Sequence, residues 1–275
     1  MPKIGLKTAK YIVDIIAAEA GAMLMDYFPT GKYHEVVEKI GLDFTAQVER
    51  EVGDFIVRQL KENFPVDTIL MKEPVATITD YARFAGAQYC WVVDPLDGAV
   101  NFSRGDKNFS VSIGLLNKGA PVLGVVYVPV EKNLYSAQID QDGAFLNGKR
   151  IKVSKTTELK KTVVAYDWSL DPEAMKVLAG HIQSFAGSVL AVKSMGSPCA
   201  DLCKLAEGKI DAYIHTDVKP WNVIASVLIC IKAGAGVTHI SGRWWQNPFE
   251  QTIFVANNRE TEHAIKDLMY KHSKQ

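Results

Sequence analysis

The spacing of apolar residues changes twice along this chain, and these changes constrain the fold most. Apolar side chains first recur at helical spacing, over about residues 6–28 and 45–63. Between residues 89 and 138 they gather in short β-rich runs separated by glycine and proline, a pattern typical of an antiparallel meander. From about residue 162, strand-like and helix-like segments alternate. We therefore expect a layered α/β sandwich, with an antiparallel N-terminal sheet and a mixed C-terminal sheet flanked by helices.

Length and composition favour one domain. The 275 residues, 48% of them hydrophobic, are enough to bury a large core, and no linker or repeat interrupts them. We expect a single domain over residues 1–275, with lobes at about 1–150 and 151–275. Lysine plus arginine equals aspartate plus glutamate at 31 each, so no overall field attracts nucleic acid, which argues against nucleic acid as the main partner.

The chain also lacks the sequence signals of export. No apolar stretch approaches the ~20 residues of a membrane span, and the first residues do not resemble a signal peptide. A cytoplasmic protein without membrane contact is the expectation. The four cysteines lack paired C-x-x-C spacing, which favours buried free thiols over a zinc site or a disulfide framework.

The segment Trp91–Gly98 carries the clearest chemical signal. In it an apolar run ends in two carboxylates, Asp94 and Asp97, on either side of a proline. A strand end would hold Asp94 rigidly, the Leu96 carbonyl can face the same cavity, and Mg²⁺ prefers such oxygen ligands. The glycine that follows lets backbone approach a ligand closely. Taken alone, the pattern leaves open both a metal site and an ordinary solvated turn.

The wider context of this segment resembles the inositol monophosphatase family. The run W-V-V-D-P-L-D-G-A-V-N-F at residues 91–102 is similar to the family signature W-[IV]-[IV]-D-P-[IL]-D-G-T-x-N-F. Further matches occur in the family's order: F-S-V-S-I-G at 109–114, G-V-V-Y at 124–127, G-A-F-L-N-G at 143–148, G-S at 196–197, D-L at 201–202, D-A-Y at 211–213 and A-N-N at 256–258. The resemblance implies the family's fold, a homodimer, and a pocket for a small phosphorylated ligand or inorganic phosphate.

Members of this family hydrolyse phosphate monoesters with bound Mg²⁺ ions, which activate water and stabilise the leaving group. The resemblance implies that the ligands come from a G-E-E segment, the D-P-x-D-G loop and a W-D motif. Asp94, the Leu96 carbonyl and Asp97 retain the middle element. The ligating glutamate of G-E-E falls on Lys72, whose ammonium cannot coordinate a metal. In a second interpretation the loop shifts by one residue and Glu73 becomes the ligand.

Other positions depart from the family's pattern as well. Asn222 stands where the W-D motif has its aspartate, so the negative charge of that aspartate is missing. Ala99 replaces the threonine that helps to hold the nucleophilic water in the family. Ala46 stands at the position of a second threonine in the family's pattern. Glu49 falls on a helper aspartate, and is either a general base or a charged residue in the first turn of a helix. At the substrate end of the pocket, His215 stands at the position of an acidic residue that contacts inositol in the family.

Together these residues predict one site with three roles. The expected catalytic residues are Glu49, Asp94 and Asp97, and the expected metal ligands are Asp94, Leu96, Asp97 and Glu73. The expected substrate contacts are Gly98, Ala99, Gly196, Ser197, His215, Asn222 and Lys72.

Two functions remain open on this basis. In the favoured one, the protein is a pseudophosphatase with weak or absent hydrolysis and weak or partial Mg²⁺ binding. It would bind a phosphorylated ligand, with Lys72 supplying positive charge in place of a metal, or a protein partner. The alternative is an active Mg²⁺-dependent phosphatase of inositol, sugar or nucleotide-derived phosphates, with a rearranged metal site that includes Glu73.

Overall fold

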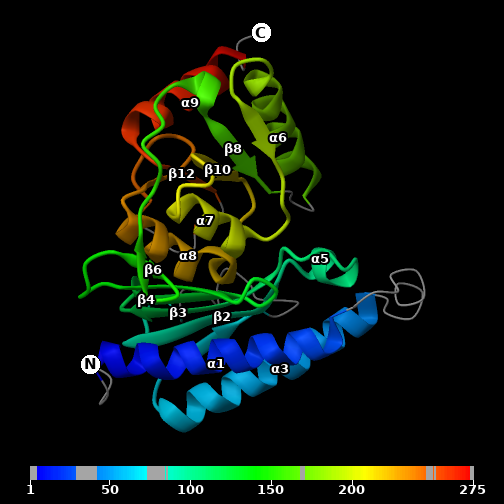
Figure 1. Ribbon diagram of the computed structural model, residues 1–275, viewed down its shortest axis with the longest axis vertical. Coiled ribbons are helices and arrows are strands. Elements are labelled where there is room, and N and C mark those ends of the chain that lie inside the picture. The colour runs from blue at the N-terminus through cyan, green and yellow to red at the C-terminus, as the bar shows by residue number, and fades with distance from the viewer. Residues whose placement is uncertain are drawn as a thin grey trace.

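The computed structural model describes residues 5–28, 42–72, 84, 86–167, 171–245, 250 and 252–272. Two long helices, α1 (Leu6–Tyr27) and α3 (Leu42–Asn63), pack beside each other and cover the outer face of the first sheet (Figure 1). Their apolar stripes recur every three or four residues and face the sheet, as the periodicity predicted. The buried members of the stripes include Val13, Ile16, Ala20 and Leu24 of α1, and Val48, Val52, Ile56 and Leu60 of α3.

The first sheet has seven strands in sequence order. They are β1 (Thr68–Met71), β2 (Tyr89–Asp97), β3 (Ser110–Asn117), β4 (Ala120–Val128), β5 (Asn133–Gln138), β6 (Ala144–Leu146) and β7 (Lys149–Ile151). The expectation of an antiparallel sheet is corrected at one edge, where β1 runs parallel to β2. Residues 72–88 separate these two strands, and a parallel pair needs a connection of about a dozen residues or more.

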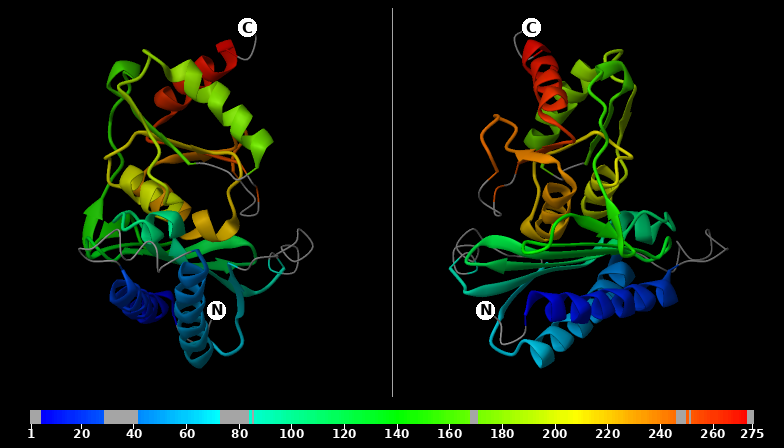
Figure 2. Two further views of the ribbon diagram at one scale, coloured as in Figure 1. Left: turned by 90° about the vertical axis from the view of Figure 1, so that its right-hand side faces the viewer. Right: turned by 60° about the vertical axis from the view of Figure 1, so that its left-hand side comes forward.

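The second sheet has five strands in the order β11-β12-β10-β8-β9 and is mixed, as predicted. Its strands are β8 (Val163–Tyr166), β9 (Ala191–Lys193), β10 (Ala212–His215), β11 (Gly236–Thr238) and β12 (Ile253–Ala256). Helices α6 (Pro172–Phe185) and α9 (Arg259–His272) cover its outer face, while α7 (Pro198–Ala206) and α8 (Pro220–Ala233) lie between the two sheets (Figures 1 and 2). The expected layered sandwich is therefore confirmed.

Helix α8 approaches the first sheet unusually closely, and this approach positions the site. A Cβ on Gly124 of β4 would lie 2.4 Å from the Ala225 carbonyl oxygen, so only glycine fits there. Nearly all of α8 is apolar and buried because both of its faces meet a layer of the core. Its first turn consequently lies beside β2, where the two candidate carboxylates are.

Smaller elements agree with the sequence as well. The Asn147-Gly148 pair joins β6 to β7 with positive φ angles of 49° and 77°, as a two-residue hairpin turn requires. The four cysteines are buried free thiols. Within the described ranges, every helix is too short or too polar to cross a lipid bilayer.

Candidate active site

A β-bulge in β2 brings the two carboxylates of the D-P-x-D-G segment together. Asp94 lies opposite Ser112 of β3 and Asp97 lies opposite Ser110, so three steps on β2 match two steps on β3. Residues three apart in a regular strand point to opposite faces, and the extra residue cancels this difference. Both side chains are buried, at 0% and 2% exposure. The motif therefore places two acidic groups in one interior site.

The oxygens of Asp94 are occupied by protein donors. Oδ1 accepts the Leu96 N–H at 3.2 Å and lies 3.8 Å from Nζ of Lys72. Oδ2 accepts Nδ2–H of Asn222, from the first turn of α8, at 2.9 Å. Burial raises the pKa of Asp94, and the Lys72 ammonium opposes that rise. The carboxylate is thus held by one cation, one backbone amide and one side-chain amide.

Lys72 lies beside the expected general base Glu49 and beside two of the residues, Asp94 and Leu96, whose oxygens the family resemblance implied for a metal. Its Nζ is 2.8 Å from Oε1 of Glu49 on α3 and donates to the Leu96 carbonyl oxygen at 3.3 Å. With Asp94 as the third neighbour, three acceptors face the three N–H donors of the ammonium. Burial lowers the pKa of Lys72, but Asp94 and Glu49 outweigh this effect and the pKa ends above its usual value. The group therefore stays charged at neutral pH.

Asp97 is bound by the neighbouring strand β3 and by the start of α7. Its Oδ2 accepts the Cys199 N–H at 2.9 Å, the Ser110 hydroxyl at 3.2 Å and the Ser197 hydroxyl. Burial, followed by the negative charge of Asp94, raises the pKa of Asp97 to about 7. Because Ser197 and Cys199 begin α7, the N-terminus of this helix faces the carboxylate and joins α7 to the end of β2.

These side chains do not fit Mg²⁺ at the position between Glu49, Asp94 and Leu96. Mg²⁺ needs near-octahedral oxygen ligation at about 2.0–2.1 Å, whereas an ammonium occupies this position and Asn222 presents an N–H to Asp94. The described residues contain no cluster of three or more His, Cys, Asp or Glu side chains suited to a metal. Glu73, the expected alternative ligand, lies outside the described residues.

The expected substrate contacts divide between this centre and a neighbouring cavity of about 660 Å³. Gly196 and His215 line the cavity, together with Asp167 and Lys204. Gly98 precedes, and Ala99 begins, the short helix α5 (Ala99–Ser103) that follows β2, and the Ser197 hydroxyl donates to Asp97 as described above. The lining residues of the cavity are Val100, Asn101, Asp106, Asn108, Asp167, Ser194, Met195, Gly196, Pro198, Lys204 and His215.

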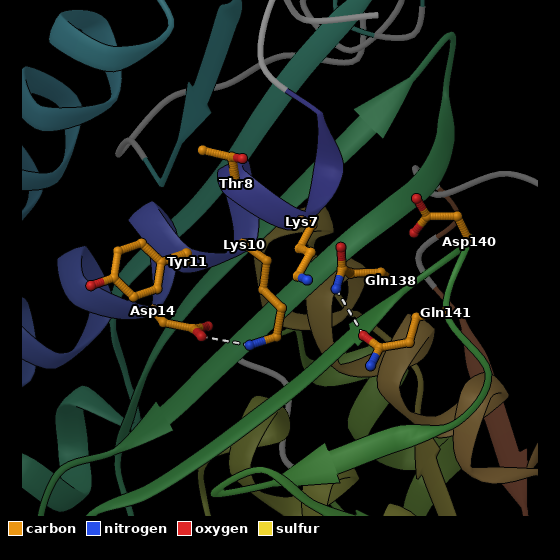
Figure 3. A pocket seen from close by; sticks show the side chains of 8 residues that line it. All are labelled: Lys7, Thr8, Lys10, Tyr11, Asp14, Gln138, Asp140 and Gln141. Atoms are coloured by element: carbon orange, nitrogen blue, oxygen red, sulfur yellow. Dashed lines mark hydrogen bonds and ion pairs between the residues drawn. The ribbon is translucent and has the colours of Figure 1, made fainter.

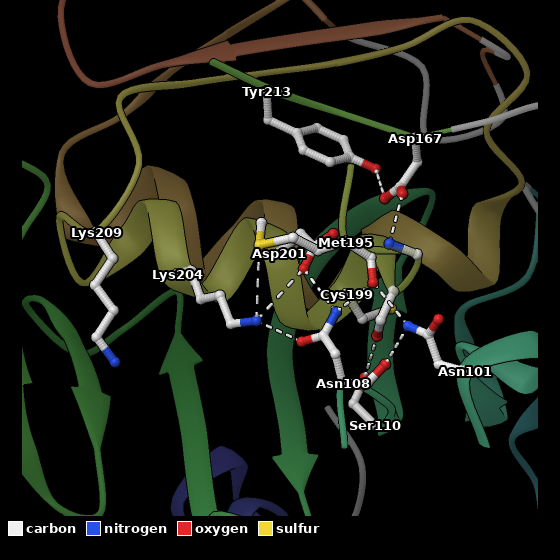
Figure 4. A network of polar contacts seen from close by, with 12 residues as sticks. Asn101, Asn108, Ser110, Asp167, Met195, Cys199, Asp201, Lys204, Lys209 and Tyr213 are labelled. Carbon is white, nitrogen blue, oxygen red and sulfur yellow. Dashed lines mark hydrogen bonds and ion pairs between the residues drawn. The ribbon is translucent and has the colours of Figure 1, made fainter. Parts of the chain in front are cut away.

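Sequence reasoning missed the polar network in the wall of this cavity (Figure 4). Asp167 accepts the Gly196 N–H at 2.9 Å on one oxygen and the Tyr213 hydroxyl at 2.9 Å on the other. Asn108 donates to Asp201 at 3.1 Å and accepts from the ammonium of Lys204. The D-L and D-A-Y matches had marked Asp201 and Tyr213, but not their hydrogen-bond partners Asn108 and Asp167, which lie 93 and 46 residues away in sequence.

A second cavity, of about 720 Å³, lies far from this chemistry (Figure 3). The N-terminal part of α1 and the end of β5 form it. A Lys10–Asp14 ion pair and a Gln138–Gln141 hydrogen bond lie within its wall. None of the predicted site residues lines it. Its lining residues are Lys7, Thr8, Lys10, Tyr11, Asp14, Gln138, Asp140 and Gln141.

Gly98→Ala is expected to destabilise the fold by roughly 2–4 kcal/mol, because two effects coincide there. The residue has a φ of +85°, and a Cβ would lie 2.8 Å from the Asn108 carbonyl oxygen. The matched control is Gly148→Ala, at φ +77° with open space around it, which should cost only about 1 kcal/mol. Urea unfolding of both variants measures the difference, and equal losses would contradict a collision at residue 98.

Comparison with known proteins agrees with this geometry. The model of the inositol monophosphatase family matches residues 7–273. A Putative Nus factor SuhB of Neisseria meningitidis is 32% identical over 73% of this chain and 75% of its own length. Inositol monophosphatase 3 of tomato (Solanum lycopersicum) is 34% identical over 82% and 84% of the two chains.

A solved structure supports the same assignment. The inositol monophosphatase from Anabaena superposes with a TM-score of 0.82 at 26% identity, over 97% of each chain. The superposition covers nearly all of the chain, and the family match begins within α1 and ends beyond α9. The fold, the D-P-L-D-G segment and the two relatives lead to one assignment. This chain belongs to the inositol monophosphatase family.

Proposed function

We propose that this protein is a pseudophosphatase of the inositol monophosphatase family, which binds a phosphorylated ligand and hydrolyses it weakly or not at all. The position of Lys72 carries the proposal. Its ammonium fills the space between the Leu96 carbonyl, Asp94 and Glu49, where a metal would have to bind. Mg²⁺ would have to displace a charged side chain that is already paired with two carboxylates.

The electrostatics of the site support the same conclusion. Metal-assisted hydrolysis needs a divalent cation to lower the pKa of a water and to neutralise the developing negative charge. Here the single positive charge of Lys72 faces the carboxylates of Glu49, Asp94 and Asp97. A phosphoryl group that gains negative charge would meet little compensation. The Ala99 side chain also has no hydroxyl to orient a water.

The proposal extends to cofactor and partners. We infer weak or partial Mg²⁺ occupancy, a ligand that is a phosphate monoester or inorganic phosphate, a cytoplasmic location and a homodimer of single-domain subunits. A protein partner is a further part of the proposal. This part is supported by the relative at 32% identity, whose name, Putative Nus factor SuhB, does not describe a phosphatase.

Phosphate release tests the proposal. Inositol 1-phosphate, glucose 1-phosphate and adenosine 2′-phosphate are incubated with the protein over a Mg²⁺ series from zero to saturation. The tomato relative, at 34% identity, is the positive control in the same buffers. We expect kcat/KM to be lower than that of the control by about 10²-fold or more. Comparable values in the two proteins would refute the pseudophosphatase.

An active enzyme with a rearranged metal site is the second candidate. It is supported by one observation, that Asp94 and Asp97 point into the same buried site from the bulged strand. Together with the Leu96 carbonyl and Glu73 they would hold a single Mg²⁺, for which Lys72 would have to turn away. Glu73→Gln distinguishes the two candidates, because it would abolish Mg²⁺-dependent turnover in the active enzyme and leave a pseudophosphatase unchanged.

A further inference from the structure

A strongly basic segment, residues 149–161, begins at the edge of the first sheet and is called the basic strip below. It carries six of the 31 lysine and arginine residues of the chain but only one of the 31 aspartate and glutamate residues. The neutral total therefore conceals a local concentration of positive charge. All six basic residues are exposed, and they are Lys149, Arg150, Lys152, Lys155, Lys160 and Lys161.

The backbone of the basic strip is held against the body of the protein. After β7 the strip runs along one side of the molecule from the first sheet to the second (Figure 1). The Val153 N–H donates to the Ala233 carbonyl oxygen at the end of α8, at 3.2 Å. Beyond the end of α7, a Cβ on Gly208 would lie only 3.0 Å from the Ser154 nitrogen. These contacts give the charges of the strip a fixed spacing.

The strand that begins the strip leaves one edge of the sheet open. Within the described part of the chain, β7 pairs only with β6 and is the last strand of its sheet. Lys149 lies opposite Leu146, directly beside the two-residue turn, and these two residues form a hydrogen-bonded pair. Because such pairs alternate with non-hydrogen-bonded ones, the backbone N–H and C=O of Arg150 point away from β6. An extended segment can pair with them as an eighth strand.

The charges beside this edge decide which segment can pair there. Of the six basic side chains, only Arg150 and Lys161 form ion pairs with carboxylates of the described residues. Arg150 lies 2.8 Å from Asp142, whose side chain is 87% exposed, so a carboxylate already binds at the edge from solvent. A second copy of β7 would place basic side chains opposite one another, which is destabilising. An acidic segment would bring the complementary charge.

The composition of the strip favours a polypeptide over a nucleic acid as the occupant. Single-stranded nucleic acids bind largely by stacking their bases on aromatic side chains, and residues 149–161 contain no aromatic residue. A strand edge presents N–H donors and C=O acceptors in turn. A peptide backbone matches both, whereas a phosphodiester backbone supplies acceptors alone.

We propose that the edge of β7 docks an extended acidic segment of a partner protein, which adds a strand to the first sheet and places carboxylates on Arg150, Lys152 and Lys155. The inference rests on the protein partner proposed above and names its docking surface and its chemistry. It does not depend on whether phosphate is hydrolysed, because no residue of the strip lines the 660 Å³ cavity or bonds to Asp94 or Asp97.

Fluorescence anisotropy with two labelled octapeptides tests the docking. One alternates glutamate with valine, and the other alternates glutamate with proline, which keeps the charge but removes the N–H groups that a strand needs. We expect the valine peptide to bind at least about tenfold more tightly. The triple variant Arg150→Glu, Lys152→Glu and Lys155→Glu should weaken its binding by about tenfold or more. Asp142→Asn frees Arg150 and should strengthen binding by about two- to threefold.

The matched control is a triple variant with the same change of net charge at exposed residues of α3, the β3–β4 turn and α6: Lys61→Glu, Lys118→Glu and Lys176→Glu. It should weaken binding by less than about threefold. An equal loss in both triple variants would show attraction by net charge alone and overturn the docking site. Equal affinity for the two peptides, or no binding of the valine peptide, would overturn strand pairing.

A single-stranded oligonucleotide of the same charge is the third probe. Tighter binding of the oligonucleotide than of the valine peptide would identify a nucleic-acid surface and overturn the proposal. Thermal unfolding confirms that each variant is folded, and Lys152→Glu and Lys155→Glu singly replace the triple variant if it is not. Phosphate release on the same samples should match the wild type. Rapid turnover would refute the pseudophosphatase and leave the docking intact, so the two proposals fail separately.

Discussion

The triple reversion Lys72→Glu, Ala99→Thr and Asn222→Asp is expected to raise Mg²⁺-dependent phosphate release by about 10²-fold or more. Lys72→Glu exchanges the ammonium beside Leu96 and Asp94 for a carboxylate. Asn222→Asp removes the N–H that occupies Asp94 Oδ2 and adds a negative oxygen at the same distance. With both changes the site gains the charge and the space that a divalent cation requires.

Each single reversion should raise Mg²⁺-dependent phosphate release by less than about tenfold, because ligands that hold one metal act as a unit. Lys149→Glu on β7 is the control, since it makes the same change of charge at an exposed position. The assay is a Mg²⁺ titration of kcat with the panel of phosphate esters. A correctly folded triple variant as inactive as the wild type would mean that something other than these residues prevents turnover.

The sequence predicts the layers and the two carboxylates because both depend on local patterns. Apolar periodicity distinguishes helix from strand without reference to distant residues. It located α1 and α3 to within a few residues, and it placed the region of β2 to β5 between residues 89 and 138. The joint placement of Asp94 and Asp97 follows from a strand that ends in a short acidic motif. Only the bulge opposite Ser110 and Ser112 needed the structure.

The direction of Lys72 is the clearest case that the sequence leaves undecided. A shift of one residue in a strand turns every side chain to the other face, so Lys72 and Glu73 were both candidates for the site. The register is set by the pairing of Met71 with Val93, after which the Lys72 N–H donates to the Val93 carbonyl at 3.1 Å. This pairing directs the ammonium toward Glu49, and no feature of the local sequence specifies it.

The cavity network was unpredictable for a different reason. Its hydrogen bonds join the segment before β3, the end of β8, the start of α7 and β10, which meet only after both sheets have formed. Motif matches identify a residue such as Asp201 as part of the family's pattern. They do not say that Asn108 is its partner or that Tyr213 binds Asp167.

Lys72→Met should lower the free energy of unfolding by roughly 2–3 kcal/mol in metal-free buffer at pH 7. The change keeps the length of the side chain but leaves the fully buried Asp94 and the largely buried Glu49 without a cation. Loss of one partner from a buried pair costs about 3–5 kcal/mol, and the 30% exposure of the Lys72 side chain reduces this cost. Urea unfolding in EDTA measures it.

Added Mg²⁺ should recover part of that stability in the Lys72→Met variant and should leave the Tm of the wild type nearly unchanged. With the ammonium gone, the Leu96 carbonyl, Asp94 and Glu49 become available as oxygen ligands, and a ligand that binds only the folded state stabilises it. The difference in unfolding free energy between the wild type and the Lys72→Met variant should shrink as the pH falls. Protonation of Asp94 and Glu49 then removes the negative charge that Lys72 balances. The control is Lys161→Met, an exposed pair with Glu158 that should change stability by less than about 0.5 kcal/mol. If Mg²⁺ raised the Tm of the wild type as much as that of the variant, Lys72 would not occupy the position of a metal.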